Sequence, residues 1–429
     1  MIRKVGVTLL AQIVAAACTL LASVALARGL GPADRGTAYI LTVVPAIVVT
    51  AVSMGLPNAF VYRIAGDPQR TSEAWGVANL TMAVTTVAVL SVAGIWILTV
   101  GRTASGEQIL ELSGSVMLIP VLLYVQLLYG LLIAVGDVSA RGWGLILQSI
   151  VYTASVVAFI ALGVGPAAAA LSQMLGGIVA TGVAHRILRR RARIGICRER
   201  AVLRTYIGFG MRGQAGVFAQ MLNYRLDALI LSVLAGNSAL GVYAVATNVG
   251  ETGTYIANAA ALALFRDVAD EGGLRRVPFA CRMTTAATAV FALAAAPAGI
   301  IGIPLVFGSD FAGAITPFVL LLPGMVALAV VKVLSMANTA AGRPDYMSIA
   351  TVAGLAMTVI LDLLLIPALA ASGAAIASTL AYATAAIASV MLYRRIRRDS
   401  IRSLLVIGIA DISAVAMRLR ISVGRPMRP

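Results

Sequence analysis

The chain has 429 residues, of which 60% are hydrophobic and only 12% are charged. This composition is far more apolar than that of an ordinary soluble domain and indicates a polytopic membrane protein. The net charge of +16 fits the enrichment of Lys and Arg on the cytoplasmic side of membranes, and since no recognisable reading module accompanies it, nucleic acid is excluded as a partner.

Twelve apolar segments follow one another along the chain, each near the roughly 20 residues that a helix needs to cross about 30 Å of hydrocarbon. In chain order they are residues 5–27, 37–62, 74–100, 113–135, 145–164, 167–184, 206–235, 239–265, 277–307, 315–336, 346–369 and 373–393. The first segment has the length of a span and no small-residue cleavage site after it, so we expect a first helix and not a signal peptide. The sequence therefore predicts an all-α membrane protein with about twelve transmembrane helices.

Basic residues gather on one side of this pattern. When the N-terminus is placed in the cytoplasm, the inner connections hold most Lys and Arg, including the dense run from Arg186 to Arg204 and, further on, Lys332. The short outer connections hold only Arg28, Arg35 and Arg102, so both termini are predicted to be cytoplasmic. We interpret the dense run as an anchor at anionic headgroups; the alternative is that it gathers pyrophosphate-bearing lipids.

An internal repeat relates the two halves of the chain. Gly31 and Gly36 recur as Gly236 and Gly241 at an offset of 205 residues. Gly136 and Gly342 are 206 residues apart, and Ser172 in an alanine-rich stretch matches Ser378 at the same offset. Because this offset spans six helices, we expect two six-helix lobes related by a pseudo-two-fold axis along the membrane normal.

The repeat and the charge pattern together predict four regions. They are an N-terminal lobe at residues 1–185, a basic cytoplasmic linker at 186–205, a C-terminal lobe at 206–394 and a basic cytoplasmic tail at 395–429. Within the tail, residues 404–417 are apolar but too short to span a membrane, and Asp411 interrupts them. We therefore expect an interfacial or buried segment there instead of a thirteenth span.

Polar residues form stripes on two neighbouring predicted helices. Gln220, Asn223 and Asp227 recur at helical spacing in the first, and Tyr243 and Glu251 do so in the second. Weaker stripes are formed by Gln12, Thr19 and Ser23 and by Gln148, Tyr152 and Ser155. Small and polar residues often hold membrane helices together, and we adopt that interpretation for the serine and threonine positions; Asp227 and Glu251 are predicted to be functional.

Arg225 lies two positions before Asp227, inside the same predicted span. Each such charge costs roughly 2.5 to 3.5 kcal/mol near the centre of a membrane helix. Arg225 points roughly 200° around the helix from Asp227, so the two share a cavity only if the helix bends, which the glycines from Gly208 to Gly216 would permit, or if Arg225 reaches round. Arg212 lies about 20 Å deeper toward the cytoplasm, within reach of the inner headgroups.

The residues that enzymes use most often show no catalytic pattern. Cys18, Cys197 and Cys281 fit neither a disulfide pair nor a metal site, and His185 is interpreted as an interfacial residue. No nucleotide-binding glycine loop and no nucleophile elbow is present. We therefore expect no enzyme activity and no cofactor.

Four stretches of the chain form a recognisable pattern: ARGLGPADRG at residues 27–36, LNYRLD at 222–227, LGVY at 240–243 followed by Glu251, and LDLLLIP at 361–367 followed by GAAIA at 373–377. Together they resemble the polysaccharide flippases of the multidrug/oligosaccharidyl-lipid/polysaccharide exporter superfamily. The resemblance covers nearly the whole chain. Asp362 departs from it, because the family usually has asparagine there.

The resemblance implies a transporter of the bacterial cytoplasmic membrane. It would move an undecaprenyl-pyrophosphate-linked oligosaccharide by alternating access for cell-surface polysaccharide synthesis, beside membrane lipids and with polymerase and glycosyltransferase partners. We hypothesise that Arg225, with Asn223, Gln220 and Tyr243 and helped by Arg212 or Arg63, meets the phosphates. Asp227 and Glu251 would hold the arginine or bind a coupling proton or sodium ion.

Alternative functions remain open at this point. A cation-coupled multidrug antiporter or a lipid II flippase would have the same fold, although a cation antiporter would favour a cavity dominated by carboxylates. A membrane glycosyltransferase or polymerase belongs to a different class and needs a catalytic loop outside the membrane. The longest outer connection, residues 101–112, is too short for such a loop.

Overall fold

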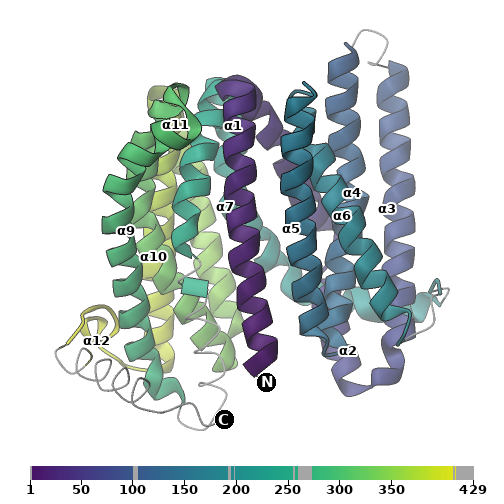
Figure 1. Cartoon of the computed structure of the whole chain (residues 1–429). Helices are drawn as coiled ribbons and strands as arrows, with labels where there is room; N and C mark the ends of the chain where they lie inside the picture. The colour runs from purple at the N-terminus through teal and green to yellow at the C-terminus, as the bar shows by residue number, and fades with distance from the viewer. Residues whose placement is uncertain are drawn as a thin grey trace, which may run out of the picture. The chain divides into compact units, whose positions relative to one another are not determined.

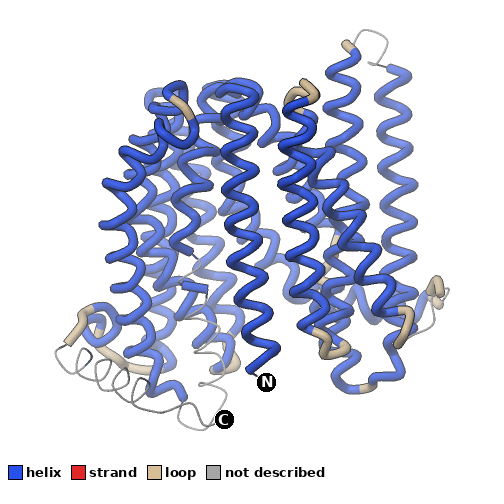
Figure 2. The backbone as a smooth tube through the Cα atoms, viewed as in Figure 1, coloured by secondary structure: helices blue, strands red, loops and turns tan. Residues whose placement is uncertain are grey.

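The computed structural model describes residues 2–99, 105–191, 195–197, 199–254, 257–258, 273–408 and 411. Helices make up nearly all of this described part, joined by short turns, and no strand occurs in it (Figure 2). The chain separates into two compact units, Met1–Asn248 with Ile303–Ala314, and Val249–Gly302 with Ile315–Pro429. The predicted all-α class is confirmed.

Within the described residues, the first unit contains helices α1 to α7 and, at 303–307, the end of α9 (Val277–Phe307) (Figure 1). The first seven of these are α1 (Ile2–Val52), α2 (Leu56–Gly66), α3 (Thr71–Thr99), α4 (Gly106–Ala134), α5 (Val138–Ala161), α6 (Ala167–Leu188) and nearly all of α7 (Arg200–Gly250), with the short turns η1 (Pro68–Arg70) and η4 (Ser309–Ala314). Helix α5 packs against both α1 and α6, and α4 packs against α3 and α6. The core of this unit includes Phe60, Trp75 and Tyr206, all fully buried.

The second unit contains the remaining elements. They are η2 (Glu251–Gly253), η3 (Gly273–Arg276), most of α9 (Val277–Phe307), α10 (Ile315–Ala340), α11 (Pro344–Ile396) and α12 (Ile401–Leu405). Helices α10 and α11 pack extensively against each other. The five-residue α12 places Leu404 in a core cluster with Val277 and Leu334. Leu404 and Asp411 are buried, whereas Leu405, Val406 and Ile407 are exposed, so the expected interfacial or buried segment at 404–417 remains a prediction.

Three helices are long enough to cross a membrane twice. Helices α1, α7 and α11 have 51, 51 and 53 residues, or about 77 to 80 Å at 1.5 Å per residue. Each changes direction at one residue with non-helical dihedral angles: Gly31 (φ 74°), Gly236 (φ 83°) and Ala370 (φ 46°). Within the described residues nine helices have the length and composition of membrane spans, and these three count twice, which matches the predicted twelve crossings.

Two predicted spans differ from the observed helices. The segment expected at 37–62 is interrupted, because α1 ends at Val52 and α2 begins at Leu56 after positive φ angles at Met54 and Gly55. The segment expected at 239–265 begins within α7, which runs on past Gly236 to Gly250, and it continues into η2. Its residues 255–256 and 259–265 lie outside the described residues.

Local geometry repeats at the predicted offset. Gly31 and Gly236 adopt nearly the same conformation, with ψ of 176° and 170°. Gly136 and Gly342 have φ of 76° and 77°, and each ends its helix with the same pair of backbone hydrogen bonds, the next residue donating to a carbonyl five positions earlier. Only a residue that tolerates positive φ fits these turns, so glycine spacing is a sound marker of the repeat.

The lobe boundaries expected from the sequence remain a prediction. The compact units part at Asn248, so α7 belongs with the N-terminal helices by its contacts, whereas the expected boundary lies at residues 186–205. Contacts made by α7 explain this grouping, since Gly210 packs directly against the backbone at Met54 and Gly55. The predicted symmetry axis likewise remains a prediction.

Candidate functional site

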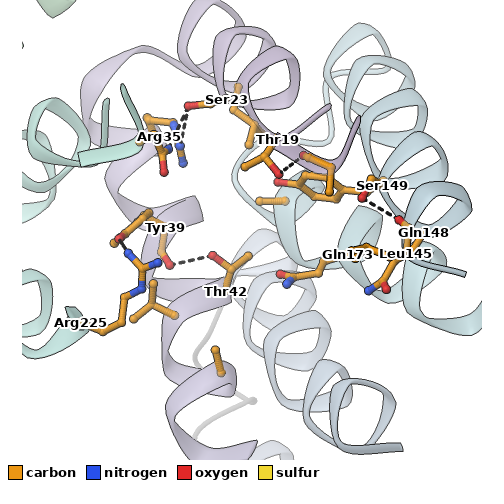
Figure 3. Close-up of a pocket in the computed structure, with 17 residues that line it drawn as sticks. Thr19, Ser23, Arg35, Tyr39, Thr42, Leu145, Gln148, Ser149, Gln173 and Arg225 are labelled. Atoms are coloured by element: carbon orange, nitrogen blue, oxygen red, sulfur yellow. Dashed lines mark hydrogen bonds between the residues drawn. The ribbon is translucent and has the colours of Figure 1, made fainter. Parts of the chain in front are cut away.

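The first unit encloses a cavity of about 350 Å³ between α1, α5, α6 and α7 (Figure 3). Its polar lining consists of Thr19, Ser23, Arg35, Tyr39, Thr42, Gln148, Ser149, Tyr152, Gln173, Arg225 and Asn248. Two of these residues are arginines, and among the described residues no aspartate or glutamate lines the cavity. The cavity is therefore a cationic chamber rich in hydroxyl and amide groups.

Helix α1 contributes lining residues both before and after its change of direction at Gly31. Before Gly31, Thr19 and Ser23 stand four residues apart and share one helical face; after Gly31, Arg35 and Tyr39 do the same. The change of direction at Gly31 lets both faces contribute to one cavity, which a straight helix of this length would not allow. Helix α5 adds its own stripe from Leu145 to Tyr152.

Arg35 is the most deeply buried charge in the cavity wall, with only 4% of its surface exposed. Its Nη2 donates a hydrogen bond to Ser23 Oγ at 3.2 Å, while its Nε is buried with no hydrogen-bond partner among the described residues. A guanidinium group has five N–H donors and is costly to bury without an anion. The Arg35 guanidinium is therefore suited to bind an anion in the cavity.

Arg225 approaches the same part of the cavity from α7. Its Nη1 donates to the Tyr39 hydroxyl at 2.7 Å, and the Arg35 guanidinium carbon lies 6.0 Å from the centre of the Tyr39 ring. Figure 3 shows Arg225 directed at Tyr39 and Arg35 at Ser23. Asn248 completes this side of the wall, since its Nδ2 donates to Ser23 Oγ at 3.0 Å. Two arginines and one tyrosine therefore form a single cationic cluster.

Asp227 is not among the residues that line the cavity. It is 3% exposed and accepts a hydrogen bond from the Tyr243 hydroxyl at 2.5 Å. Asn223 is also buried, and Gln220 donates to the Tyr224 hydroxyl at 2.9 Å; none of these stripe residues lines the cavity. Gly236 is the one residue with non-helical dihedral angles within α7, whose residues are all described, so the backbone stays helical from Gly208 to Asp227. Which sides Arg225 and Asp227 face remains a prediction.

The other predicted arginines lie elsewhere in the first unit. The Arg63 guanidinium carbon lies 5.8 Å from the centre of the Tyr206 ring, and Arg212 is exposed. Neither lines the cavity.

Glu251 belongs to the second unit, where it interacts electrostatically with Lys332. Lys332 in turn donates from Nζ to Asn258 Oδ1 at 2.8 Å. The sequence assigned Lys332 to the inner surface, but it lies within α10, eight residues before the helix ends at Ala340. Asp362, the departure noted from the family pattern, is fully buried within α11.

Sequence reasoning missed Arg35 and Tyr39, because it placed Arg35 in an outer connection. The signal was available: Arg35, Tyr39 and Thr42 follow one another at helical spacing with no break after Gly36. The two weaker polar stripes, on α1 and α5, also contribute residues to the cavity. Thr19 and Ser23 of α1 line the cavity, as do Gln148 and Tyr152 of α5, whereas Gln12 and Ser155 do not.

Comparison with known proteins gives one family and one fold. Residues 1–265 match the family described as polysaccharide biosynthesis protein. No curated protein matches the chain. Several solved structures of membrane transporters match it over most of its length.

Three of these structures illustrate the likeness. A lipid II flippase, MurJ, in an inward closed conformation is 12% identical, with a TM-score of 0.73 over 100% of this chain and 94% of that one. An inward-facing multidrug resistance MATE transporter of the MOP superfamily is 16% identical, with a TM-score of 0.68 over 88% and 93%. A MOP superfamily transporter from Pyrococcus furiosus, described as having a binding pocket of reverse polarity, is 18% identical, with a TM-score of 0.61 over 92% and 94%. At these identities the likeness establishes the fold, and the predicted two-lobed membrane fold is confirmed.

Proposed function

Because the chain belongs to the polysaccharide biosynthesis protein family, we propose that it is a flippase that carries an undecaprenyl-pyrophosphate-linked oligosaccharide across the bacterial cytoplasmic membrane. The observation that supports this substrate class is that Arg35 and Arg225 lie in one cavity to which the described part of the chain contributes no carboxylate. Both termini would then be cytoplasmic, as the distribution of basic residues predicts.

The lining chemistry supports a substrate that is anionic at one point and rich in hydroxyls elsewhere. Guanidinium groups form strong charge-assisted hydrogen bonds with phosphate oxygens, and Arg35 has donor capacity to spare. Gln148, Gln173 and Asn248 offer amide donors and acceptors of the kind that sugar hydroxyls require. A volume of about 350 Å³ lies near the small end of ligand pockets, so we assign the cavity to the diphosphate and the first sugar.

Transport would follow from replacing water around the diphosphate. A phosphate-bearing head group is costly to move through hydrocarbon unless protein groups substitute for its hydration shell. The cationic cluster would supply that substitution when the cavity is open to the cytoplasm, and release would follow when the cavity opens to the other side. Alternating access of this kind is part of the proposal, as is coupling to a proton or sodium gradient through Asp227 or Glu251.

The positive charge of the cavity lining argues against the multidrug antiporter, which is the first alternative function. A cation-coupled multidrug antiporter binds positively charged substrates, which the buried Arg35 and the partly buried Arg225 would repel. A lipid II flippase carries the same diphosphate and a sugar, so the cavity suits that substrate equally well. Enzyme activity has no support from the lining, which offers groups for binding an anion and no paired acid and base.

The proposal is tested with purified protein in liposomes that contain undecaprenyl-pyrophosphate-linked oligosaccharide. We expect the lipid to become accessible on the opposite leaflet with wild-type protein, and the Arg225→Ala variant to be inactive. The matched control is Arg204→Ala, which removes an exposed arginine from the same helix. Equal rates for Arg225→Ala and wild type would refute the role of Arg225. Extrusion of cationic dyes with no movement of the lipid would favour the antiporter.

A further inference from the structure

A second hollow in the first unit is a groove of about 650 Å³ along α6, which we call the α4–α6 groove. Its lining consists of Tyr124 from α4 and of Ile178, Thr181, Gly182, His185, Arg186 and Arg189 from α6 and its C-terminal end. It is separate from the cavity described above, to which α6 contributes Ala169 and Gln173 near its opposite end. About 20 Å of helix separates Gln173 from Arg186.

The groove is apolar at one end and cationic at the other. Ile178 is 49% exposed, and a Cβ on Gly182 would have no atom within 4 Å, so this part of the helix surface is open. Arg186 and Arg189 are three residues apart on one helical face, and both are exposed. Within the described residues neither takes part in an ion pair, whereas Arg191 nearby is paired with Asp137 at 2.9 Å.

The walls of the groove are held by contacts behind them. His185 lies edge-on to Trp75, with ring centres 5.1 Å apart. The Tyr124 hydroxyl donates to Asn79 Oδ1 at 2.7 Å, which fixes the tyrosine ring on the α4 side. Neither contact involves the two arginines. The groove therefore has a shaped apolar part and two uncommitted cations at its end.

Helix α6 has the length and composition of a membrane span, so an apolar groove on its surface faces hydrocarbon, and basic residues at its end stand at the level of lipid headgroups. We propose that the α4–α6 groove binds an anionic phospholipid, with the phosphate on Arg186 and Arg189 and an acyl chain over Gly182 and Ile178. The charge of the arginines selects an anionic headgroup over a zwitterionic one. This assignment does not depend on the proposed transport function.

Native mass spectrometry of the full chain, purified in detergent, tests the proposal with added phosphatidylglycerol or phosphatidylcholine. We expect wild-type protein to retain one phosphatidylglycerol molecule at concentrations where phosphatidylcholine is lost. The Arg186→Gln/Arg189→Gln variant should bind phosphatidylglycerol about tenfold more weakly or worse, because two direct charge-assisted contacts with the phosphate are lost. Gly182→Leu should fill the groove and abolish retention of both lipids.

Two variants serve as controls. Arg190→Gln removes an exposed arginine that does not line the groove, and Gly94→Leu adds the same side chain at an open position on α3; both should bind like wild type. If Gly182→Leu fails to fold, the double arginine variant decides the question. Equal retention of both lipids by wild-type protein, or unchanged preference in the double arginine variant, would overturn the proposal. So would displacement by inorganic phosphate, or by undecaprenyl pyrophosphate at concentrations below those of phosphatidylglycerol, which would assign the groove to a free anion or to the transported lipid.

Discussion

Gly36 and Gly241 occupy equivalent places in two interlocking helix bends of the first unit. A Cβ on Gly36 would lie 1.9 Å from the carbonyl oxygen of Asn237, and a Cβ on Gly241 would lie 1.9 Å from the carbonyl oxygen of Pro32. The contact is reciprocal, and the Asn237 side chain adds a hydrogen bond to Thr37 at 3.0 Å. The two copies of the glycine pattern in the sequence are therefore also partners in space.

Replacing either glycine by alanine should destabilise the protein. The neighbouring atoms belong to backbone and have little freedom to move, so we expect Gly36→Ala and Gly241→Ala each to cost about 1 to 3 kcal/mol or more, as overpacked sites do. Thermal unfolding in detergent measures the effect. Gly208→Ala, at an open position on α7 without a positive φ angle, is the matched control. A Gly36→Ala protein as stable as that control would contradict the reciprocal contact.

The Arg35→Met substitution should weaken substrate binding without lowering the stability of the protein. Arg35 is buried with a donor unsatisfied within the described part of the chain, so an apolar side chain of similar length should leave the protein at least as stable as wild type. Transport of the lipid-linked sugar should fall by about tenfold or more, because a charge-assisted phosphate contact is lost. Inorganic pyrophosphate should raise the unfolding temperature of wild type and not of the variant. A variant that is strongly destabilised and still stabilised by pyrophosphate would make Arg35 a purely structural residue.

Tyr243→Phe should destabilise the protein by about 1 to 3 kcal/mol, since it removes a hydrogen bond to the buried carboxylate of Asp227. Tyr62→Phe, which changes a largely exposed tyrosine, is the control and should have almost no effect. Chemical or thermal unfolding gives the comparison. If both variants unfold at the wild-type midpoint, the contact between Tyr243 and Asp227 contributes nothing to folding.

Helix α12 and Asp411 should stay packed against α9 at neutral and mildly acidic pH. Two hydrogen bonds from the Arg282 guanidinium, at 2.6 and 2.7 Å, and one from the Gly408 amide lower the pKa of Asp411 below its ordinary value. A carboxylate with a lowered pKa stabilises the folded state above its unfolded pKa of about 3.9, and this contribution is lost only as pH falls through the lower folded value. Trypsin cleavage at Arg402 should thus be slow and unchanged between about pH 6 and 8.

Asp411→Asn should abolish the ion pair and speed cleavage at Arg402 at neutral pH. Asp310→Asn, at an exposed position in η4, is the control and should be cleaved like wild type. Cleavage of the Asp411→Asn protein at the wild-type rate would show that α12 is held by Leu404 and its apolar neighbours alone.

The candidate site was only partly predictable, and its residues show why. Arg225 was identified because a charge within an apolar span is unusual wherever the helix points. Arg35 was overlooked because it follows Gly31, where a break in an apolar segment usually marks a loop. Asp227 was grouped with a path for substrate because its stripe is polar. A polar stripe also forms where buried groups satisfy one another, as Asp227 and Tyr243 do, so its role in transport remains a prediction.

The sequence by itself determined the membrane class, the number of crossings and the positions of the repeated glycine turns, because span length and tolerance of positive φ are properties of short stretches of chain. Only the tertiary structure decided which polar residues meet. Arg35 and Arg225 contact the same tyrosine because α1 changes direction at Gly31 and brings its second arm beside α7. Helical periodicity defines a face and not the partner opposite it, so a cavity without carboxylates could be recognised only once the helices were packed.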